Sequence, residues 1–471
     1  MIATSGHELD TPRSPASDLS LLGPRILLLA LLMAGLAPAQ DQPDAGERNQ
    51  QEPTFEAPSL LSRDSSFTES GGKPLEFGLF GKISGVYDSG LTPVFVANAG
   101  VPFAPQADYG VEASFGAAAV RRWRRAKLSV EYRGVYRKYA DATLFDGWDH
   151  FLQLAYSRAL ARHVTLDFKT TLGTTTLANG DFAYLPISTL DRFGLPLNEL
   201  FDNRTNYLES RVDLTWQKTA RLSFGFGGDG FVVRRQSLLL AGLNGYTARV
   251  SVAYRLTARQ TISAAYNNTY FDFQRAFGDS RLQIPTAGYA VLLARHWDLS
   301  TQAGAARVQT LGLTQVALDP AIAALTGESF ATVTFSGTSH LPVGEARLVR
   351  TFKASSLTFD YTMGVTPGNG YYLTSRQNSA AIDYSFLAGR RWEARGNAGF
   401  NRLSALGQDL GRYTNLQGGI ELFYNLTDAA HVDLRYDYRH YTTEDAILQK
   451  DSNRVSLGLA FSLGEPFRTV R

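Results

Sequence analysis

The chain has 471 residues, a formal net charge of +2 and no cysteine. Hydrophobic residues make up 44% of it, and the mean hydropathy is -0.16. The missing cysteines exclude disulfides and thiolate metal sites, and the near-neutral charge gives no case for a nucleic-acid partner. A helical membrane protein is excluded as well, because it would need several apolar runs of about 20 residues.

The N-terminal region carries an export signal. One continuous apolar run, Ile26 to Ala34, follows an arginine and precedes Ala37-Pro38-Ala39. A basic residue, a short apolar stretch and a small-residue cleavage motif are typical of a Sec signal peptide, which predicts residues 1–39 as the leader. Residues 40–73 are rich in Gln, Asp, Glu, Pro and Ser, and we expect a disordered periplasmic segment there.

Residues 74–464 repeat one pattern, in which about ten residues alternate apolar with polar or small before a break. The last copy places Val455, Leu457, Leu459, Phe461 and Leu463 on one face of a strand and small or polar residues on the other. Strands project successive side chains to opposite sides, so each copy has one apolar surface. The pattern predicts an all-β fold, a single transmembrane antiparallel up-and-down β-barrel, with residues 465–471 as a tail.

The breaks between strands fall into two alternating classes. The short ones are Arg121–Arg125, Leu160–His163, Gln217–Ala220, Thr257–Gln260, Arg295–Asp298, Lys353–Ser355, Ala388–Arg391 and Thr427–Ala430. The long ones are Ser89–Asp108, Asp141–Trp148, Leu177–Arg204, Ser237–Leu243, Ala276–Pro285, Gln309–Pro342, Pro367–Arg376, Leu403–Gly411 and Thr442–Ser452. They predict about 18 strands, with the short turns in the periplasm and the long loops outside the cell.

Aromatic residues support a membrane location. Trp123, Trp216, Trp297 and Trp392 lie at or beside short turns, and such residues favour the headgroup level of a bilayer. A series of soluble β-sandwiches is the alternative, but it would show linkers between units of about 100 residues. We find none, and predict the outer membrane of a Gram-negative bacterium as the location.

Charged residues occupy the face opposite the apolar one and should line the lumen. The pore-lining candidates are Lys82, Arg133, Arg137, Glu209, Arg211, Asp213, Arg249, Arg255, Arg395, Glu421, Asp433, Arg435, Asp437 and Arg439. Two interpretations stand side by side. The charges form rings that select solutes, or they form cross-strand ion pairs that stiffen the wall.

Catalysis finds little support in the sequence. The seven histidines are scattered, no nucleophile motif accompanies them, and we expect no enzyme, no cofactor and no metal site. The long loop Gln309–Pro342 is instead the main functional candidate, with a short helix expected at Asp319–Leu325 and either an inward or an outward position. The second candidate is Leu177–Arg204.

The alternating strands, the signal peptide and the aromatic residues at the turns resemble porin-like outer-membrane β-barrels in general. A short segment resembles a narrower group. Pro58-Ser59-Leu60-Leu61-Ser62-Arg63 and Ser84-Gly85-Val86-Tyr87-Asp88-Ser89-Gly90-Leu91 are similar to barrels encoded in exopolysaccharide-secretion loci of soil bacteria. The resemblance implies a wide, arginine-rich lumen like that of the alginate exporter. In this chain the lumen charges balance, and the C-terminus does not end on an aromatic residue.

Two functional hypotheses follow. The first is a channel for passive transport or export of solutes, with exopolysaccharide as the suggested cargo. The second is a surface-interaction barrel whose long loops bind a partner while its lumen is occluded. The expected partners are outer-membrane lipid, the barrel-assembly machinery and periplasmic polysaccharide-export components.

Overall fold

The computed structural model describes residues 75–91, 106–176, 203–318, 327, 329–389, 391–407, 411–427, 429–444 and 449–463. The expected signal peptide, lead-in and tail lie outside these ranges. So does the expected helix at Asp319–Leu325. Within the described residues, no helix is long and apolar enough to span a membrane.

Alternating sequence produces strands almost throughout the described chain. They are β1 (Leu75–Leu91), β2 (Gln106–Trp123), β3 (Ala126–Tyr139), β4 (Gly147–Ala161), β5 (Val164–Thr175), β6 (Thr205–Gln217), β7 (Leu222–Arg235), β8 (Gly242–Thr257), β9 (Gln260–Gln274), β10 (Gly278–Ala294), β11 (Trp297–Ala317), β12 (Phe330–Thr351), β13 (Ser355–Thr366), β14 (Ser375–Ala388), β15 (Trp392–Ala405), β16 (Arg412–Asn425), β17 (Ala430–Thr443) and β18 (Gln449–Leu463). A 3₁₀ turn, η2 (Thr143–Phe145), lies between β3 and β4.

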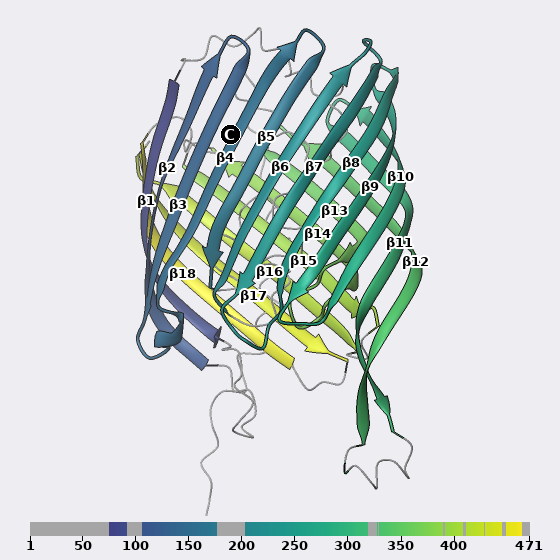
Figure 1. The fold of residues 1–471 in the computed structure, drawn as a ribbon. Coiled ribbons are helices and arrows are strands. Elements are labelled where there is room, and N and C mark those ends of the chain that lie inside the picture. Colours follow the sequence, from purple (N-terminus) through teal and green to yellow (C-terminus); the bar gives the residue numbers. More distant parts are fainter. Residues whose placement is uncertain are drawn as a thin grey trace, which may run out of the picture. The chain divides into compact units, whose positions relative to one another are not determined.

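The strands form one closed antiparallel ring (Figure 1). Each strand pairs with its neighbours in sequence, and β1 closes the ring on β18 from Leu79↔Leu463 to Asp88↔Arg454. Closure satisfies both edges of the sheet, which a membrane-spanning strand requires. The single barrel of 18 antiparallel strands confirms the predicted fold and strand number.

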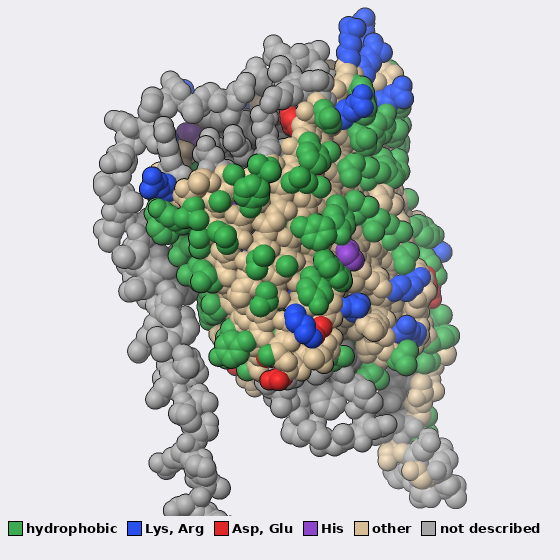
Figure 2. Space-filling view, turned by 90° about the vertical axis from the view of Figure 1, so that its left-hand side faces the viewer, with side chains coloured by type: hydrophobic (Ala, Val, Ile, Leu, Met, Phe, Trp, Pro, Cys, Tyr) green, Lys and Arg blue, Asp and Glu red, His purple; other side chains and the backbone are tan. Residues whose placement is uncertain are grey.

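Burial along β18 shows which side of the wall faces inward. Ser456, Gly458 and Ala460 are buried, whereas Leu457 and Leu459 are more than half exposed. The exposed face of a soluble protein would not carry so many large apolar side chains, since they belong in contact with lipid. Figure 2 shows hydrophobic side chains spread over this outer surface, with Lys and Arg both at the short-turn end, at the top of the view, and lower down.

Two of the predicted long loops are shorter than the sequence indicated. The prediction of a loop at Ala276–Pro285 is wrong, because β10 begins at Gly278 and Pro285 lies inside it opposite Tyr266 of β9. The proline was interpreted as a break, but proline fits a strand wherever the ladder does not need its missing N–H.

The predicted loop Gln309–Pro342 is likewise mostly a β-hairpin. β11 continues to Ala317 and β12 begins at Phe330, and the two pair along this whole extension. On the other side of each strand the pairing stops earlier. β10 pairs with β11 only as far as Gly312 of β11, and β13 pairs with β12 only as far as Gly344 of β12. The hairpin therefore extends beyond the rest of the wall at the long-loop end (Figure 1).

Candidate functional site

The inner face of the barrel carries the predicted pore-lining residues. All fourteen occupy inward positions on β1, β3, β6, β8, β15, β16 and β17, by the alternation of burial along these strands. Several join in ion pairs. Lys82 Nζ of β1 lies 2.8 Å from Asp433 Oδ2 of β17, across the intervening strand β18. A contact between non-adjacent strands is possible only on the concave side of the wall.

Other pairs form within one strand. Residues two positions apart share a face, and such pairs join Arg211 to Asp213 at 2.5 Å, Arg395 to Glu393 at 2.7 Å and Arg435 to Asp437 at 2.6 Å. Arg133 donates to Glu131 in the same way. Glu421 lies in register with Arg395 on one side and Arg435 on the other.

The remaining candidates lie in the same lining. Arg249 of β8 reaches Asp229 of β7 at 2.6 Å and Asp213 of β6 at 3.5 Å. Arg439 donates to the Asn415 side chain and to the Tyr413 hydroxyl, both at 3.2 Å. Glu209 and Arg255 are half-buried on the inner face. The cross-strand pairs of the second interpretation are thus present, and selection of solutes by these charges stays a prediction.

A continuous buried network lies on the inner wall near the long-loop end. Glu112 of β2 binds Arg137 of β3 at 2.6 Å and Arg454 of β18 at 2.6 Å. Arg137 also pairs with Asp149 of β4, and Asp149 accepts from the Thr176 backbone N–H at 3.0 Å. Arg137 and Asp149 are 1% and 0% exposed. The sequence reasoning missed Asp149 because it placed this residue immediately after a long loop.

The sequence predicted a loop at Pro367–Arg376 but not that it folds inward. Pro367–Thr374, which we call the bridge, connects β13 to β14, and most of it is buried. Asn369 organises it, since the Asn369 side-chain oxygen accepts from Tyr372 N at 2.9 Å and Tyr371 N at 3.3 Å. Gly368 and Gly370 have φ of 74° and 89°, which glycine adopts without strain.

Gly370 and Thr374 of the bridge are hydrogen-bonded to distant parts of the barrel. Gly370 O accepts from Ala241 N, at the end of the β7–β8 loop, at 3.0 Å. With its φ of 89° and a Cβ that would lie 3.0 Å from Ala241 O, any other residue at position 370 would be strained. The Ser280 hydroxyl of β10 lies 2.6 Å from that of Thr374. In ring order, the β13–β14 connection lies about a third of the circumference from the β7–β8 loop and about a fifth from β10.

Tyr372 extends the connection to a third part of the wall. Its ring is fully buried and belongs to an apolar cluster with Leu240, Leu403, Tyr413 and Tyr441. The ring centroids of Tyr372 and Tyr413 are 5.9 Å apart, and Tyr413 lies 6.0 Å from Tyr441. Because the β7–β8 loop and β16 lie almost opposite each other in the ring, the bridge links facing walls near the barrel mouth.

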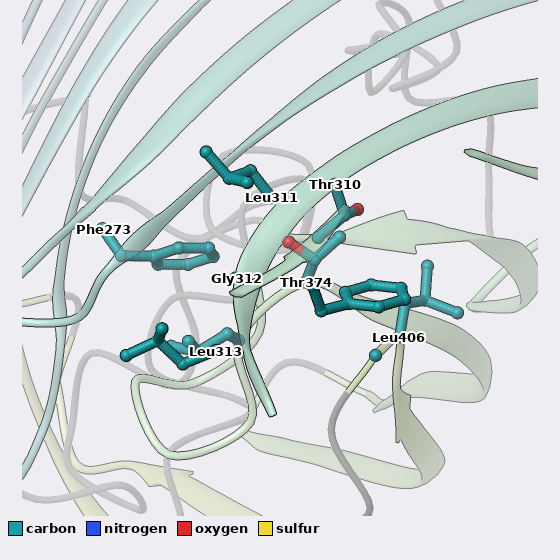
Figure 3. A pocket seen from close by; sticks show the side chains of 10 residues that line it. Phe273, Thr310, Leu311, Gly312, Leu313, Thr374 and Leu406 are labelled. Atoms are coloured by element: carbon teal, nitrogen blue, oxygen red, sulfur yellow. The ribbon is translucent and has the colours of Figure 1, made fainter. Parts of the chain in front are cut away.

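A small, partly open pocket of about 20 Å³ lies beside the bridge (Figure 3). Phe273, Phe335, Leu373 and Leu406 are among the side chains that line it. Its lining comes from β9, β11, β12, the bridge and the connection that follows β15. No group of His, Cys, Asp and Glu in the described part of the chain is arranged to hold a metal ion.

Neither of the two loops that the sequence singled out is seen to constrict the barrel in the described residues. Gln309–Pro342 is largely a hairpin that continues the wall, and Leu177–Arg204 lies almost wholly outside the described residues. Among the connections that the structure describes, Pro367–Thr374 does enter the barrel. Its only signal in the sequence is the turn-forming stretch Pro367-Gly368-Asn369-Gly370, which indicates a tight local fold and not its direction.

The closed antiparallel ring, the apolar outer face and the polar inner face define an outer-membrane β-barrel of the porin type, as predicted. No protein-family model and no curated protein sequence matches the chain.

Solved structures of similar architecture include Pseudomonas aeruginosa OccK5 (OpdH), with 10% identity over 83% of this chain and 98% of that one and a TM-score of 0.41. The outer membrane protein OpdK from the same organism has 10% identity over 83% and 99% of the two chains, with a TM-score of 0.39. Acinetobacter baumannii OccAB1 has 12% identity over 85% of this chain and 99% of that one, with a TM-score of 0.39. Similarity at this level assigns no function.

Proposed function

We propose that the protein is a passive channel for small polar solutes across the outer membrane. The observation that supports this most is a closed ring of 18 strands whose inner face carries charged and polar residues. Barrels of 16–18 strands enclose an aqueous channel, whereas about eight strands are filled by side chains.

The bridge gives the proposed channel its size limit. Gly370 and Tyr372, in its middle, contact walls that face each other, so it narrows the mouth at the long-loop end. Loops that constrict a lumen restrict passage to small solutes. A polysaccharide chain would require the bridge to leave the mouth, so export of exopolysaccharide with periplasmic partners is the less favoured form of the proposal.

Planar-bilayer recording tests the channel. The full chain should give ohmic single-channel conductance, and replacing Gly368–Leu373 with a Gly-Ser segment of equal length should raise it severalfold. Vesicle swelling should show uptake of monosaccharides and exclusion of oligosaccharides by the parent only. Equal passage of long polysaccharide through the parent would support the export hypothesis instead.

A matched pair of point variants tests the role of the bridge. Tyr372 is fully buried in the cluster, whereas its neighbour Tyr371 is 40% exposed. Tyr372→Ala should therefore loosen the bridge and raise the conductance, while Tyr371→Ala should leave the bridge in place. No conductance from the parent or from either variant would refute the channel and favour the occluded, loop-binding alternative.

A further inference from the structure

The short turns at one end of the barrel are rich in basic side chains. Seven of the eight short turns carry Lys or Arg, and only the β16–β17 turn has none. The exposed basic residues of these turns, which we call the basic ring, are Arg124, Arg125, Arg162, Lys218, Arg221, Arg259, Arg295, Lys353 and Arg391. Figure 2 shows Lys and Arg side chains projecting at this end, at the top of the view.

Members of the basic ring have no ion-pair partner among the described residues. At the opposite end, two exposed cations lie beside acids. Lys138 pairs with Asp146, and Arg412 lies 3.7 Å from Glu444. Unpaired cations facing one solvent layer attract anions in that layer.

An aromatic belt places the basic ring at the level of lipid headgroups. Trp123, Trp216, Trp297 and Trp392 lie at the strand ends that adjoin the short turns. Arginines stack on two of them, with the guanidinium carbon of Arg121 5.0 Å from the Trp123 ring and that of Arg350 4.7 Å from the Trp297 ring. Such belts mark the boundary between hydrocarbon and headgroups.

We propose that the basic ring binds the phosphates of anionic glycerophospholipids. Guanidinium groups match phosphate oxygens with two parallel hydrogen bonds, and an anionic leaflet attracts basic residues at its surface. The short turns of outer-membrane barrels face the periplasm, which makes the inner leaflet the source of these lipids. The binding concerns the outer wall and is independent of conduction through the lumen.

The tryptophans themselves report on the lipids around the ring. The parent protein is reconstituted in vesicles that contain either brominated phosphatidylglycerol or brominated phosphatidylcholine at equal mole fraction. Bromine quenches indole fluorescence on contact, and four of the five tryptophans lie at this end. Brominated phosphatidylglycerol should quench the tryptophan fluorescence at least three times as strongly as brominated phosphatidylcholine. The excess should vanish in 1 M salt, where the Debye length is about 3 Å.

Two triple variants separate the basic ring from basic residues in general. Arg124→Gln, Arg162→Gln and Arg259→Gln together should bring the ratio of the two lipids close to one. The control replaces the same number of exposed cations at the long-loop end, Lys138→Gln, Arg402→Gln and Arg412→Gln, and should keep the parent ratio. Equal quenching by both lipids in the parent, or an equal fall in the control, would overturn the proposal.

A labelling experiment distinguishes the phosphates of inner-leaflet glycerophospholipids from those of lipopolysaccharide in the outer leaflet. The chain has no cysteine, so Arg124→Cys provides a single site for a membrane-impermeant maleimide. Protection on intact cells and labelling after the outer membrane is opened would place the ring against the inner leaflet. Labelling on intact cells would place it against lipopolysaccharide and overturn the assignment to glycerophospholipid.

Discussion

Replacing Leu459 with arginine tests which face of β18 meets lipid and how deep it lies. The outward residues of this strand are apolar from Val455 to Leu463, and Leu459, at the centre of that run, is 56% exposed. Arginine facing lipid costs about 2–4 kcal/mol at the bilayer midplane and about 0–1 kcal/mol near the interface.

The same strand offers a matched control four residues away. Leu463 is also outward and half exposed, at the short-turn end. At about 3.3 Å per residue and a tilt of about 40°, it lies roughly 10 Å nearer the interface than Leu459. Leu463→Arg should therefore cost about 1 kcal/mol or less.

Reversible urea unfolding from lipid vesicles, followed by tryptophan fluorescence, measures both free energies. The difference between the two variants is the informative quantity, because the substitution, strand and face are identical. Equal costs at the two positions would show that the apolar run is not centred on the bilayer. A negligible cost at Leu459 would show that this face does not contact lipid.

Three further outcomes follow from the inner face. Arg137→Met removes one member of a fully buried network and should destabilise the barrel by about 3–5 kcal/mol, whereas Arg133→Met breaks a partly exposed pair and should cost under about 1 kcal/mol; the same unfolding assay compares them. Arg435→Ser combined with Arg439→Ser should make the pore more cation-selective, and an unchanged reversal potential in a salt gradient would show that neither residue influences the path. Gly370→Val should push the bridge off Ala241 and raise conductance, and parent-like conductance would contradict the contact.

The strands were predictable because their signal is local. Alternation such as Val455 to Leu463 follows from the two-residue period of a strand and the two environments of a barrel wall. Boundaries were harder where the pattern lost its contrast. In the extension of β11 and β12, residues of mixed polarity pair with each other, such as Leu313 with Thr334. The apolar-to-polar alternation is therefore weak there, and it does not predict where the two strands end.

The bridge could not be predicted in the same way. Tyr372 owes its position to Leu240 and Tyr413, which are far from it in sequence and come from opposite parts of the ring. Alternation over about ten residues predicts which face of a strand turns inward, but it does not predict which loop folds into the lumen. Buried tyrosines with a hydrogen-bonding hydroxyl are common in cores, so composition alone did not mark them.

The arrangement of the inner charges bears directly on selectivity. The groups that are most buried, such as Arg137 and Asp433, are held by neighbours and offer little surface to a passing solute. The more exposed cations, Arg133 and Arg395, each have a glutamate two residues away on the same strand. Opposite charges so close together cancel within a Debye length of about 8 Å. A solute in the lumen therefore meets short dipoles in place of a ring of one sign, and discrimination by size at the bridge should exceed discrimination by charge.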